Sequence, residues 1–539
     1  MHTVEQLGLL KMDFLGLRNL SIVDRTLELI GSESLDIDNL KLDDEKTFKL
    51  FAEGKMTGVF QLESRVAQST SRSLKPKRFE DIVALVALIR PGPLGAGMHN
   101  EFADRANNRK EIEYLHNDLE SILNETYGVI LYQEQVMQIA EKIAGFNLQE
   151  ADNLRVAMGK KIPKVMEEQR KKFTDGAVSN NYSEQFAIEL FDQIAYFAGY
   201  GFNKSHSVPY ALLAYQTAYL KANYPAEYIA ACLTAVKRDK DRTAIFLSEA
   251  RDMGVKVSTP DINLSSSDFT VNDNEILFGL SAVRNVGDIT ADKIVLERES
   301  NGDFESIEDF LSRIDSRSLN KRGVEALIQG GGLDKFGLTR KGMFDSAIEL
   351  IENAKELKAN KENNQGSLFE MEDSNSTPIN INNTEWDKKE LLEREREMLG
   401  FFVSEDPLEG YGEVLKSESS HSIIELQSLE DEEEINVTIS GLISNVQKRV
   451  SRRGNPWIQF DIQDLTGSSG VLLFNKLVDK YNASIDGEIY LKVSGTYVGG
   501  SENTIRARDV EVIEPSKMIE NLDISPPVSY THLTLPTKA

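Results

Sequence analysis

One stretch determines the fold that we expect for the middle of the chain. It reads Phe197-Ala198-Gly199-Tyr200-Gly201-Phe202-Asn203-Lys204-Ser205-His206-Ser207. Its glycines mark a loop, and its hydrogen-bond donors cluster immediately before a helix that Ser207 can cap and Pro209 can enter. From about residue 40 to residue 236 apolar residues recur at helical spacing, as in Val136, Ile139, Ala140 and Ile143. We therefore expect one large helical domain in which these donors form the edge of a pocket for phosphate or sugar.

Upstream of this domain the chain opens with a predicted strand and a helix. In Leu9-Leu10-Lys11-Met12-Asp13-Phe14-Leu15-Gly16 apolar residues alternate with Lys11 and Asp13, which is typical of a strand that ends at Gly16. An amphipathic helix follows and stops at Gly31, with one apolar stripe of Leu20, Val23, Leu27 and Ile30. Because a lone strand cannot form a sheet, we interpret Met1 as a truncation point of a longer protein.

Downstream, Asn285-Val286-Gly287 followed by Ala291 and Ile294 predicts a helix-hairpin-helix, and residues 319–333 a degenerate second copy. Such hairpins present helix N-termini to phosphates without reading base sequence. A plain pair of antiparallel helices is the alternative. Residues 354–385 are polar, apart from Leu368-Phe369, and predict a linker.

The last structured region is predicted to be all-β. An acidic run ends at Glu434, and five β-patterned stretches follow near 435–447, 457–464, 470–475, 487–497 and 503–513. Five short strands in this span indicate an OB-type barrel, with Ile458, Phe460 and Ile462 inward and Trp457 and Gln459 outward.

Composition limits the function classes. The 539 residues predict three or four structural units, and the apolar fraction of 40% without a membrane-spanning run or signal pattern favours a cytoplasmic protein with no membrane partner. The single Cys232 cannot form an internal disulfide, so it is expected in the core. The net charge of −26 opposes phosphate binding, yet residues 155–172 hold seven basic and two acidic side chains. Such a basic run suits a phosphate-bearing ligand, and an ordinary solvated helix face explains it equally well.

Six motifs carry a family resemblance. Beyond the quoted stretch they are Lys11-Met12-Asp13-Phe14-Leu15-Gly16-Leu17, Val59-Phe60-Gln61-Leu62-Glu63-Ser64, Ala87-Leu88-Ile89-Arg90-Pro91-Gly92-Pro93, Tyr132-Gln133-Glu134-Gln135-Val136-Met137 and Arg155-Val156-Ala157-Met158-Gly159-Lys160-Lys161. In content and order they resemble the alpha subunit of bacterial DNA polymerase III, a replicative DNA polymerase of the C family. The resemblance covers roughly residues 5 to 515.

The implied fold is multidomain and mainly α, with a C-terminal all-β OB-type barrel. The implied regions are the end of a palm domain with the third catalytic aspartate strand (1–35), fingers (36–240), a helix-hairpin-helix DNA-binding region (241–353), a linker with a clamp-binding motif (354–385), a connecting segment (386–434), an OB-fold domain (435–515) and a truncated or non-native tail (516–539).

The resemblance also implies a nucleotide site. Asp13 would be a catalytic carboxylate and a ligand of Mg²⁺, in a two-metal site that is only partly present because two further palm aspartates are absent. The implied nucleotide contacts are Lys11, Arg90, Lys160, Lys161, Asn203, Lys204 and His206. Pro163 can begin a helix just after Lys160 and Lys161, where backbone amides add to their charge. Without the resemblance, each of these residues has an ordinary alternative. Lys11 and Asp13 would be a surface pair, and Arg90 would be a surface arginine. Lys160 and Lys161 would belong to a basic loop, and His206 would be a structural histidine.

Further contacts concern DNA and the sliding clamp. Gln365-Gly366-Ser367-Leu368-Phe369 resembles the clamp-binding pentapeptide, in which Gln365, Leu368 and Phe369 would enter a pocket on the sliding clamp. Asn285 and Gly287 would contact DNA through the first hairpin, although Asn285 replaces a usual glycine. In the loop between the first two barrel strands, Lys448, Arg449, Arg452 and Arg453 would bind single-stranded template, and Trp457 would stack on a base. The alternative is a solvated basic loop with Trp457 in a domain interface.

The implied function is template-directed deoxynucleotidyl transfer to a primer 3′-hydroxyl in bacterial chromosome replication. Its partners would be primer-template DNA, dNTPs, the sliding clamp and other replisome subunits. From another class, a non-catalytic module that binds DNA and tethers to the clamp is the alternative. Because two catalytic aspartates are missing, we expect this chain alone to be inactive as a polymerase.

Overall fold

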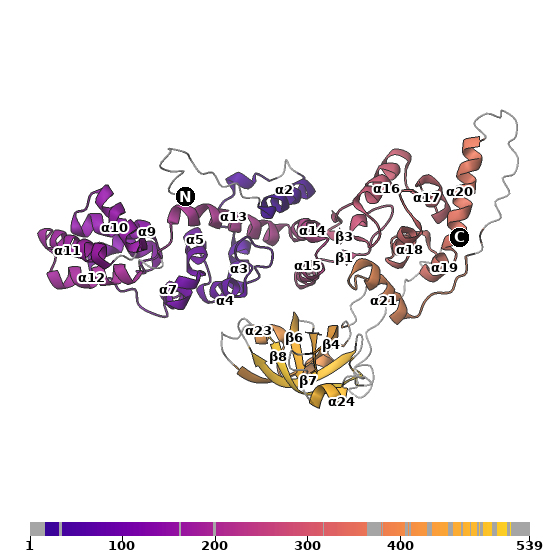
Figure 1. Ribbon diagram of the computed structural model, residues 1–539. Coiled ribbons are helices and arrows are strands. Elements are labelled where there is room, and N and C mark those ends of the chain that lie inside the picture. The colour runs from indigo at the N-terminus through magenta and orange to yellow at the C-terminus, as the bar shows by residue number, and fades with distance from the viewer. Residues whose placement is uncertain are drawn as a thin grey trace, which may run out of the picture. The chain divides into compact units, whose positions relative to one another are not determined.

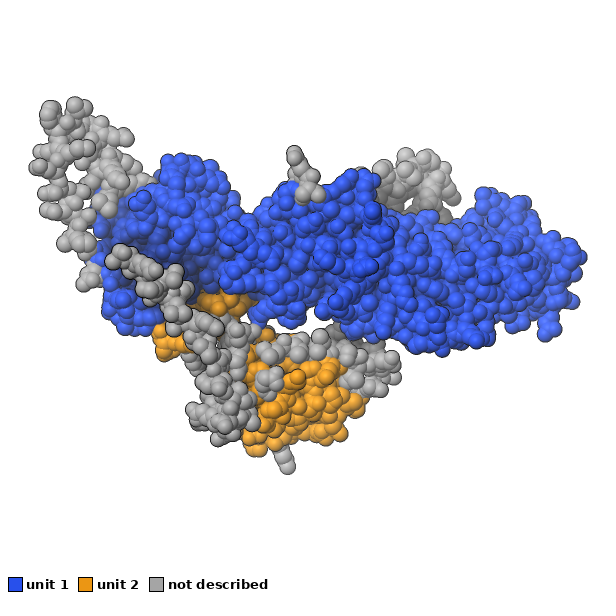
Figure 2. All heavy atoms as spheres, turned by 180° about the vertical axis from the view of Figure 1, so that it is seen from behind, with its two compact units in different colours: residues 1–385 blue, residues 386–539 orange. Residues whose placement is uncertain are grey.

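The structure is a computed structural model, and Figure 1 shows its helices and strands. It describes residues 17–31, 35–160, 163–197, 201–315, 317–363, 379, 381–404, 408, 411–427, 434–450, 456–464, 467–474, 476–481, 485, 489–498, 504–514 and 518. The chain forms two compact units, residues 1–385 and 386–539, which Figure 2 colours separately. The strand expected over residues 9–16 lies outside the described residues.

From Arg18 to Ala106, the described elements of unit 1 are all helices. They are α2 (Arg18–Ile30), η1 (Ile37–Asn39), α3 (Glu45–Glu53), α4 (Arg65–Leu74), α5 (Phe79–Leu88), α6 (Pro91–Gly95) and α7 (Met98–Ala106). Helix α2 ends at Gly31 as the sequence predicts, but its buried residues are Ile22, Val23 and Thr26, and Leu20 is 54% exposed. The buried face therefore overlaps only partly with the predicted apolar stripe.

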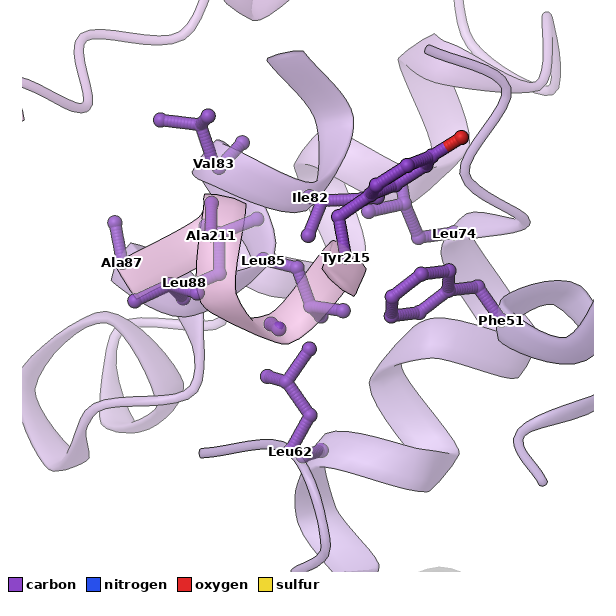
Figure 3. Packing of buried hydrophobic residues seen from close by; sticks show 14 of the residues in the cluster. Phe51, Leu62, Leu74, Ile82, Val83, Leu85, Ala87, Leu88, Ala211 and Tyr215 are labelled. Carbon is purple, nitrogen blue, oxygen red and sulfur yellow. The ribbon is translucent and has the colours of Figure 1, made fainter. Parts of the chain in front are cut away.

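Helix α5 is the centre of the first core. Each of its residues from Asp81 to Leu88 is buried, because the run Ile82-Val83-Ala84-Leu85-Val86-Ala87-Leu88 is apolar on every side. It packs against the long helix α13 (Lys204–Asn223), whose Ala211, Ala214 and Ala218 allow a close approach. Figure 3 shows Tyr215 of α13 beside Phe51, Leu74 and Ile82. This packing fixes the N-terminal turn of α13 relative to α5.

A second core lies among the following helices. Their elements are η2 (Asn117–Leu119), α8 (Glu120–Leu123), η3 (Asn124–Thr126), α9 (Gln133–Ala144), α10 (Leu148–Lys160), α11 (Pro163–Ser179) and α12 (Glu184–Phe197). The expected stripe of Val136, Ile139, Ala140 and Ile143 is buried on α9. Helix α11 approaches α9 so closely that a Cβ at Gly176 would lie 2.2 Å from the carbonyl oxygen of Ala144. Only glycine fits this crossing.

Two more helices and a small sheet lead into the hairpin region. The elements are α14 (Pro225–Val236), α15 (Lys240–Asp252), β1 (Val257–Ser258), β2 (Thr270–Asn272), β3 (Glu275–Leu277), η4 (Leu280–Ala282), α16 (Asp288–Asn301), α17 (Ile307–Arg313), α18 (Lys321–Gln329), η5 (Asp334–Phe336), α19 (Arg340–Asp345) and α20 (Ala347–Asn363). Strand β3 lies between β1 and β2. Cys232 is fully buried on α14, and burial raises the pKa of its thiol to about 12, so it is an inert core residue.

Residues 354–363, which the sequence assigns to the linker, form the last part of α20. Their Lys, Glu, Leu and Ala side chains have high helix propensity, and Ala354 anchors the turn because it is buried. Polar composition alone therefore placed the start of the linker too early.

Unit 2 contains a closed five-stranded barrel, and the described residues before it form the helices α21 (Lys388–Leu399), α22 (Gly412–Ser417) and α23 (Ile423–Gln427). The strands are β4 (Glu434–Val450), β5 (Pro456–Asp464), β6 (Gly467–Phe474), β7 (Tyr490–Val498) and β8 (Thr504–Val512), in the order β4-β5-β6-β8-β7. Ile458, Phe460 and Ile462 are fully buried and alternate with outward residues, which confirms the predicted inward face. Helix α24 (Lys476–Tyr481) between β6 and β7 was not predicted.

Candidate nucleotide and DNA interface

Helix α13 begins at Lys204, four residues earlier than a Ser207 cap would place it. Asn203 is its N-cap, since the Asn203 side chain accepts a hydrogen bond from the His206 backbone N–H at 3.0 Å. Ser207 is buried inside the first turns, and its hydroxyl donates to the Val83 carbonyl of α5 at 2.6 Å. The prediction that Ser207 caps the helix was therefore wrong, because Asn203 competes better for that role.

The N-terminal turn of α13 is fastened to the start of α9. The Phe202 N–H donates to the Leu131 carbonyl at 3.2 Å, and the Gln133 N–H donates to the Phe202 carbonyl at 2.9 Å. The side-chain amide of Gln133 also donates to the Gly201 carbonyl at 3.0 Å. Two segments 70 residues apart thus form one rigid junction, and we call residues 131–135 with 201–206 the α9/α13 junction.

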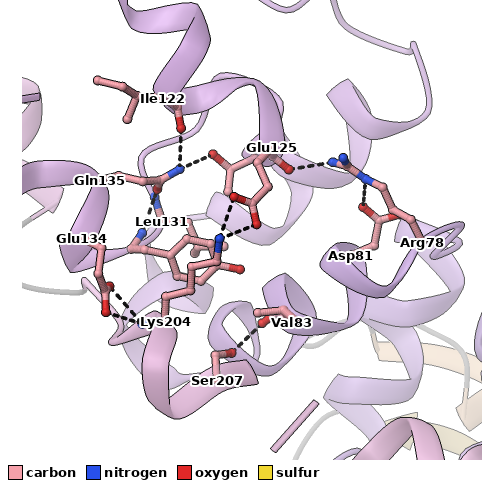
Figure 4. A network of polar contacts seen from close by, with 12 residues as sticks. Arg78, Asp81, Val83, Ile122, Glu125, Leu131, Glu134, Gln135, Lys204 and Ser207 are labelled. Carbon is pink, nitrogen blue, oxygen red and sulfur yellow. Dashed lines mark hydrogen bonds and ion pairs between the residues drawn. The ribbon is translucent and has the colours of Figure 1, made fainter. Parts of the chain in front are cut away.

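Two glutamates hold Lys204 at this junction (Figure 4). The Glu134 carboxylate accepts hydrogen bonds from the Lys204 backbone N–H at 3.0 and 3.1 Å and from the Ser205 N–H at 3.4 Å. The Glu125 carboxylate accepts from the Lys204 ammonium at 2.7 Å. The same ammonium lies 5.5 Å from the centroid of the Tyr132 ring. Sequence reasoning assigned no role to either glutamate, although Glu134 lies in the Tyr-Gln-Glu-Gln motif.

Arg90 and His206 both contact the aromatic ring of Phe202 in the junction. The Arg90 guanidinium lies 4.5 Å from the centroid of the Phe202 ring, which also lies 5.7 Å from the His206 ring. His206 is exposed, and its ring centroid lies 4.3 Å from that of Tyr210. Four predicted nucleotide contacts, Arg90, Asn203, Lys204 and His206, are therefore close neighbours.

The other predicted nucleotide residues are less well defined. Lys11, Asp13 and Lys161 lie outside the described residues, and Lys160 is the last residue of α10, with its side chain outside the description. Helix α11 begins at Pro163 as expected. Three of the seven basic side chains in the run pair with nearby carboxylates: Arg155 with Asp152, Arg170 with Asp192, and Lys172 with Glu150. These pairs reduce the charge that the run offers to a ligand.

No group of three His, Cys, Asp or Glu side chains among the described residues is arranged to hold a metal ion. Asp13, which the sequence assigns to Mg²⁺, is not among them. The assignment of Mg²⁺ therefore stays a prediction.

The first hairpin places Asn285 and Gly287 at the N-terminus of α16. Asn285 has a φ of 66°, in the left-handed region that favours glycine and that asparagine tolerates, which explains how it replaces a glycine. Both residues are exposed, and Gly287 is the N-cap. The neighbouring Asp288 pairs with Lys237 at 2.6 Å and with Arg238 at 2.6 Å. An acidic group thus adjoins the predicted phosphate contact.

On the barrel, three side chains form a row across three strands. Lys448 and Arg449 lie on β4 rather than in a loop, because pairing with β5 continues to Val450. The register places Arg449 opposite Trp457 and Trp457 opposite Phe474. The Arg449 guanidinium lies 5.4 Å from the Trp457 ring centroid, and the Trp457 and Phe474 rings stack at 6.3 Å. Sequence reasoning missed Phe474, whose outward position and 43% exposure follow from strand alternation.

Several DNA and clamp contacts from the sequence fall outside the described residues. They are Arg452 and Arg453 of the β4–β5 loop and the clamp-binding Gln365, Leu368 and Phe369. Among the described residues, none of the helices is both long and apolar enough to cross a membrane.

Helix-hairpin-helix regions contact DNA backbones in many proteins, and OB-type barrels commonly bind oligonucleotides or oligosaccharides, so this multidomain fold is typical of the nucleic-acid-binding class. Residues 19–181 match the bacterial DNA polymerase III alpha subunit finger domain, and residues 254–343 match a helix-hairpin-helix motif. The chain belongs to the family of the bacterial DNA polymerase III alpha subunit.

Curated relatives agree with this family. The chain is 38% identical to DNA polymerase III subunit alpha of Mycobacterium tuberculosis (strain CDC 1551 / Oshkosh), over 99% of this chain and 46% of the relative. It is 42% identical to the Saccharopolyspora erythraea subunit, over 93% of this chain and 43% of the relative. The Thermus aquaticus subunit is 40% identical, over 96% of this chain and 43% of the relative. The chain thus spans less than half the length of these relatives.

Proposed function

We propose that this chain is the nucleotide-binding and DNA-binding part of a replicative DNA polymerase that adds deoxynucleotides to a primer 3′-hydroxyl in bacterial chromosome replication. The observation that carries the proposal is that Arg90 lies against Phe202 of the α9/α13 junction, which itself contains Asn203, Lys204 and His206. The family of the chain makes this arrangement meaningful, since the same residues would otherwise be a polar surface patch.

Arg90 and Lys204 supply the cations that a triphosphate needs. Their charges would neutralise the phosphates, and the rings of Phe202 and Tyr132 beneath them limit where those charges can lie. Asn203 and Glu134 fix the backbone, so binding would not have to order it. His206 is exposed beside the same ring and can donate a hydrogen bond to a phosphate or sugar oxygen.

Asp13 would hold one Mg²⁺, and metal ions of this kind stabilise the developing charge on the transferred phosphoryl group when bound. The residues at the junction would bind and orient the nucleotide. On the barrel, Arg449, Trp457 and Phe474 would receive single-stranded template by stacking, and Gln365 to Phe369 would tether the chain to its clamp.

A second candidate function is a non-catalytic module that binds DNA and the clamp. The stacked row Arg449, Trp457 and Phe474 favours it, since this row needs no metal and no primer end to act. Primer extension by the full chain separates the two. Template-dependent extension with Mg²⁺ and dNTPs supports the enzyme, and DNA binding without extension supports the module for this chain.

Nucleotide binding tests the proposal more directly. The full chain should bind dATP with Mg²⁺ in calorimetry, and Arg90→Ala and Lys204→Ala should each weaken binding by ~10-fold, the value of one charge-assisted contact. Lys110→Ala is the matched control, because Lys110 pairs with Glu101 and lies outside the junction. Equal binding by all four proteins would contradict the proposal.

A further inference from the structure

The two glutamates at Lys204 hold opposite ends of the same residue. Glu134 accepts from the backbone N–H at 3.0 and 3.1 Å, whereas Glu125 accepts from the ammonium at 2.7 Å (Figure 4). The Glu134 contact therefore fixes the backbone of Lys204, and the Glu125 contact fixes the position of its ammonium group. These two roles predict different consequences when each carboxylate is removed.

Glu134 fills the N-terminus of α13. Its carboxylate accepts hydrogen bonds from the backbone N–H groups of Lys204 and Ser205. The Asn203 side chain accepts from the His206 N–H at 3.0 Å, and the Asn203 carbonyl accepts from the Ser207 N–H at 3.1 Å. The protein's own oxygens thus accept from three first-turn N–H groups, those of Lys204, Ser205 and His206, which would otherwise attract an anion. A phosphate near this turn would have to meet side chains, and Glu134 sets the direction in which Lys204 leaves the backbone.

Glu125 occupies the position that a phosphate oxygen would take on the Lys204 ammonium. The pair is half-buried, with side-chain exposures of 34% for Lys204 and 30% for Glu125, so a ligand can reach it. The Lys204 ammonium has three N–H donors and could contact two anions, but the charge of Glu125 would repel a phosphate bound beside it, so the phosphate competes with this carboxylate for the ammonium.

The candidate replacement donor for Glu125 is Tyr132, whose ring centroid lies 5.5 Å from the Lys204 ammonium. The Tyr132 hydroxyl is buried and has no hydrogen-bond partner within the described part of the chain. Burial raises the pKa of Tyr132, and the charge of Glu125 raises it further, so the hydroxyl stays a donor near that carboxylate. When the Lys204 ammonium leaves, the carboxylate need not remain unpaired.

We propose that Glu134 is a positioning residue that aims Lys204 at the phosphates of a nucleoside triphosphate, and that Glu125 is a competing anion that holds the ammonium until phosphate displaces it. This inference rests on the proposed role of Lys204 as a phosphate contact. The inference gives Glu125 and Glu134 opposite effects on phosphate binding, although both carry the same charge near Lys204.

The test titrates the full chain with Mg²⁺-tripolyphosphate and with Mg²⁺-dATP in a calorimeter. Glu125→Gln should tighten tripolyphosphate binding by ~3-fold, because it removes a competitor of the strength of a partly exposed ion pair. Glu134→Ala should weaken tripolyphosphate binding by ~10-fold, because the Lys204 backbone that carries the ammonium is no longer held in place. Glu134→Gln keeps one acceptor oxygen and should fall between wild type and Glu134→Ala. Glu141→Gln, on the same helix and without a junction contact, should change nothing.

The signs of these effects decide the outcome. Tighter binding by both Glu125→Gln and Glu134→Ala would show a general charge effect and overturn the proposal. If Glu134→Ala does not fold, Glu134→Gln decides, and binding equal to or tighter than wild type overturns it. If wild type fails to bind, or Lys204→Ala binds as wild type does, the proposed function itself fails. Binding that is lost in Lys204→Ala but unchanged in both glutamate variants leaves the function standing and removes the positioning role.

Discussion

At the scale of single residues, the identity of a helix cap controls where the predicted nucleotide contacts lie. Asn203→Ala removes the acceptor for the His206 amide and should cost about 1 kcal/mol of unfolding free energy, the usual value of an N-cap. Asn203→Ser keeps an acceptor and should lose much less. Chemical denaturation of the full chain measures both. Equal stability of Asn203→Ala and wild type would contradict the observed cap.

A second residue-scale prediction concerns Asp288 and pH. Hydrogen bonds from Lys237 and then Arg238 lower the pKa of the Asp288 carboxyl below its ordinary value of 3.8. A lowered folded-state pKa stabilises the protein above the unfolded-state pKa, and this contribution is lost as the pH falls through the folded-state pKa. The stability advantage of wild type over Asp288→Asn should therefore be constant from pH 7 to 5 and shrink below about pH 4.

Denaturation midpoints of both proteins at pH 7, 5 and 3 measure this difference. An advantage that grows as the pH falls would contradict the ion pairs. The same substitution frees Arg238 beside the first hairpin, whereas Lys237 stays paired with Asp268, so binding of double-stranded DNA should tighten and show a steeper salt dependence.

The candidate site was only partly predictable from residues. Arg90, Asn203, Lys204 and His206 could be selected from motifs, and they are neighbours in the structure. The partners Glu125 and Glu134 could not, because a sequence does not say which carboxylate an ammonium or a helix turn will meet across 70 residues or more. The cap was misassigned for the same kind of reason: Asn203 and Ser207 are both good caps, and packing of Ser207 against Val83 decides between them.

At the scale of elements, the crossing of α9 and α11 depends on one glycine. A Cβ at Gly176 would lie 2.2 Å from the Ala144 carbonyl oxygen, which is backbone and cannot rotate away. Gly176→Ala should destabilise the chain by about 1–3 kcal/mol, as overpacking against a fixed group does. Gly95→Ala is the control, since nothing lies within 4 Å of its Cβ position and its φ is not positive. Thermal unfolding of the two variants should differ clearly, and similar midpoints would argue against this close approach.

The barrel row is the second element-scale feature. Phe474→Ala and Trp457→Ala should each weaken single-stranded DNA binding by about 1–3 kcal/mol, the usual cost of one lost base stack. Val450→Ala, which shortens an exposed side chain one residue from Arg449, should leave binding unchanged. Fluorescence anisotropy with a labelled oligonucleotide measures all three. Normal binding by both aromatic variants would show that the row is only surface packing.

Elements with strong periodicity were the most predictable. Alternation along 457–464 gave the inward face of β5 correctly, because the side-chain period of a strand leaves little freedom. Helix α24 was missed because six residues are too few to show a helical period. The end of α20 was missed because an exposed helix and a polar linker share the same composition, and only the burial of Ala354 separates them.

At the scale of the whole molecule, the chain combines a helical unit that carries the predicted nucleotide contacts with a barrel unit that carries a stacking row. The finger-domain match over residues 19–181 precedes the helix-hairpin-helix match over residues 254–343, and the chain spans less than half the length of its relatives. Catalytic turnover by the intact protein is therefore a proposal. Nucleotide binding by the α9/α13 junction, in contrast, can be tested on this chain.

The most direct measurement of that property is photo-crosslinking of the full chain with dATP that carries an azidoanilide on its γ-phosphate, followed by peptide mapping. We predict labels at residues 90–93, 155–161 and 202–206, and their loss when unmodified dATP is in excess. Labels confined to the barrel or to residues 285–301, or labels that excess dATP does not remove, would contradict a nucleotide site at the α9/α13 junction.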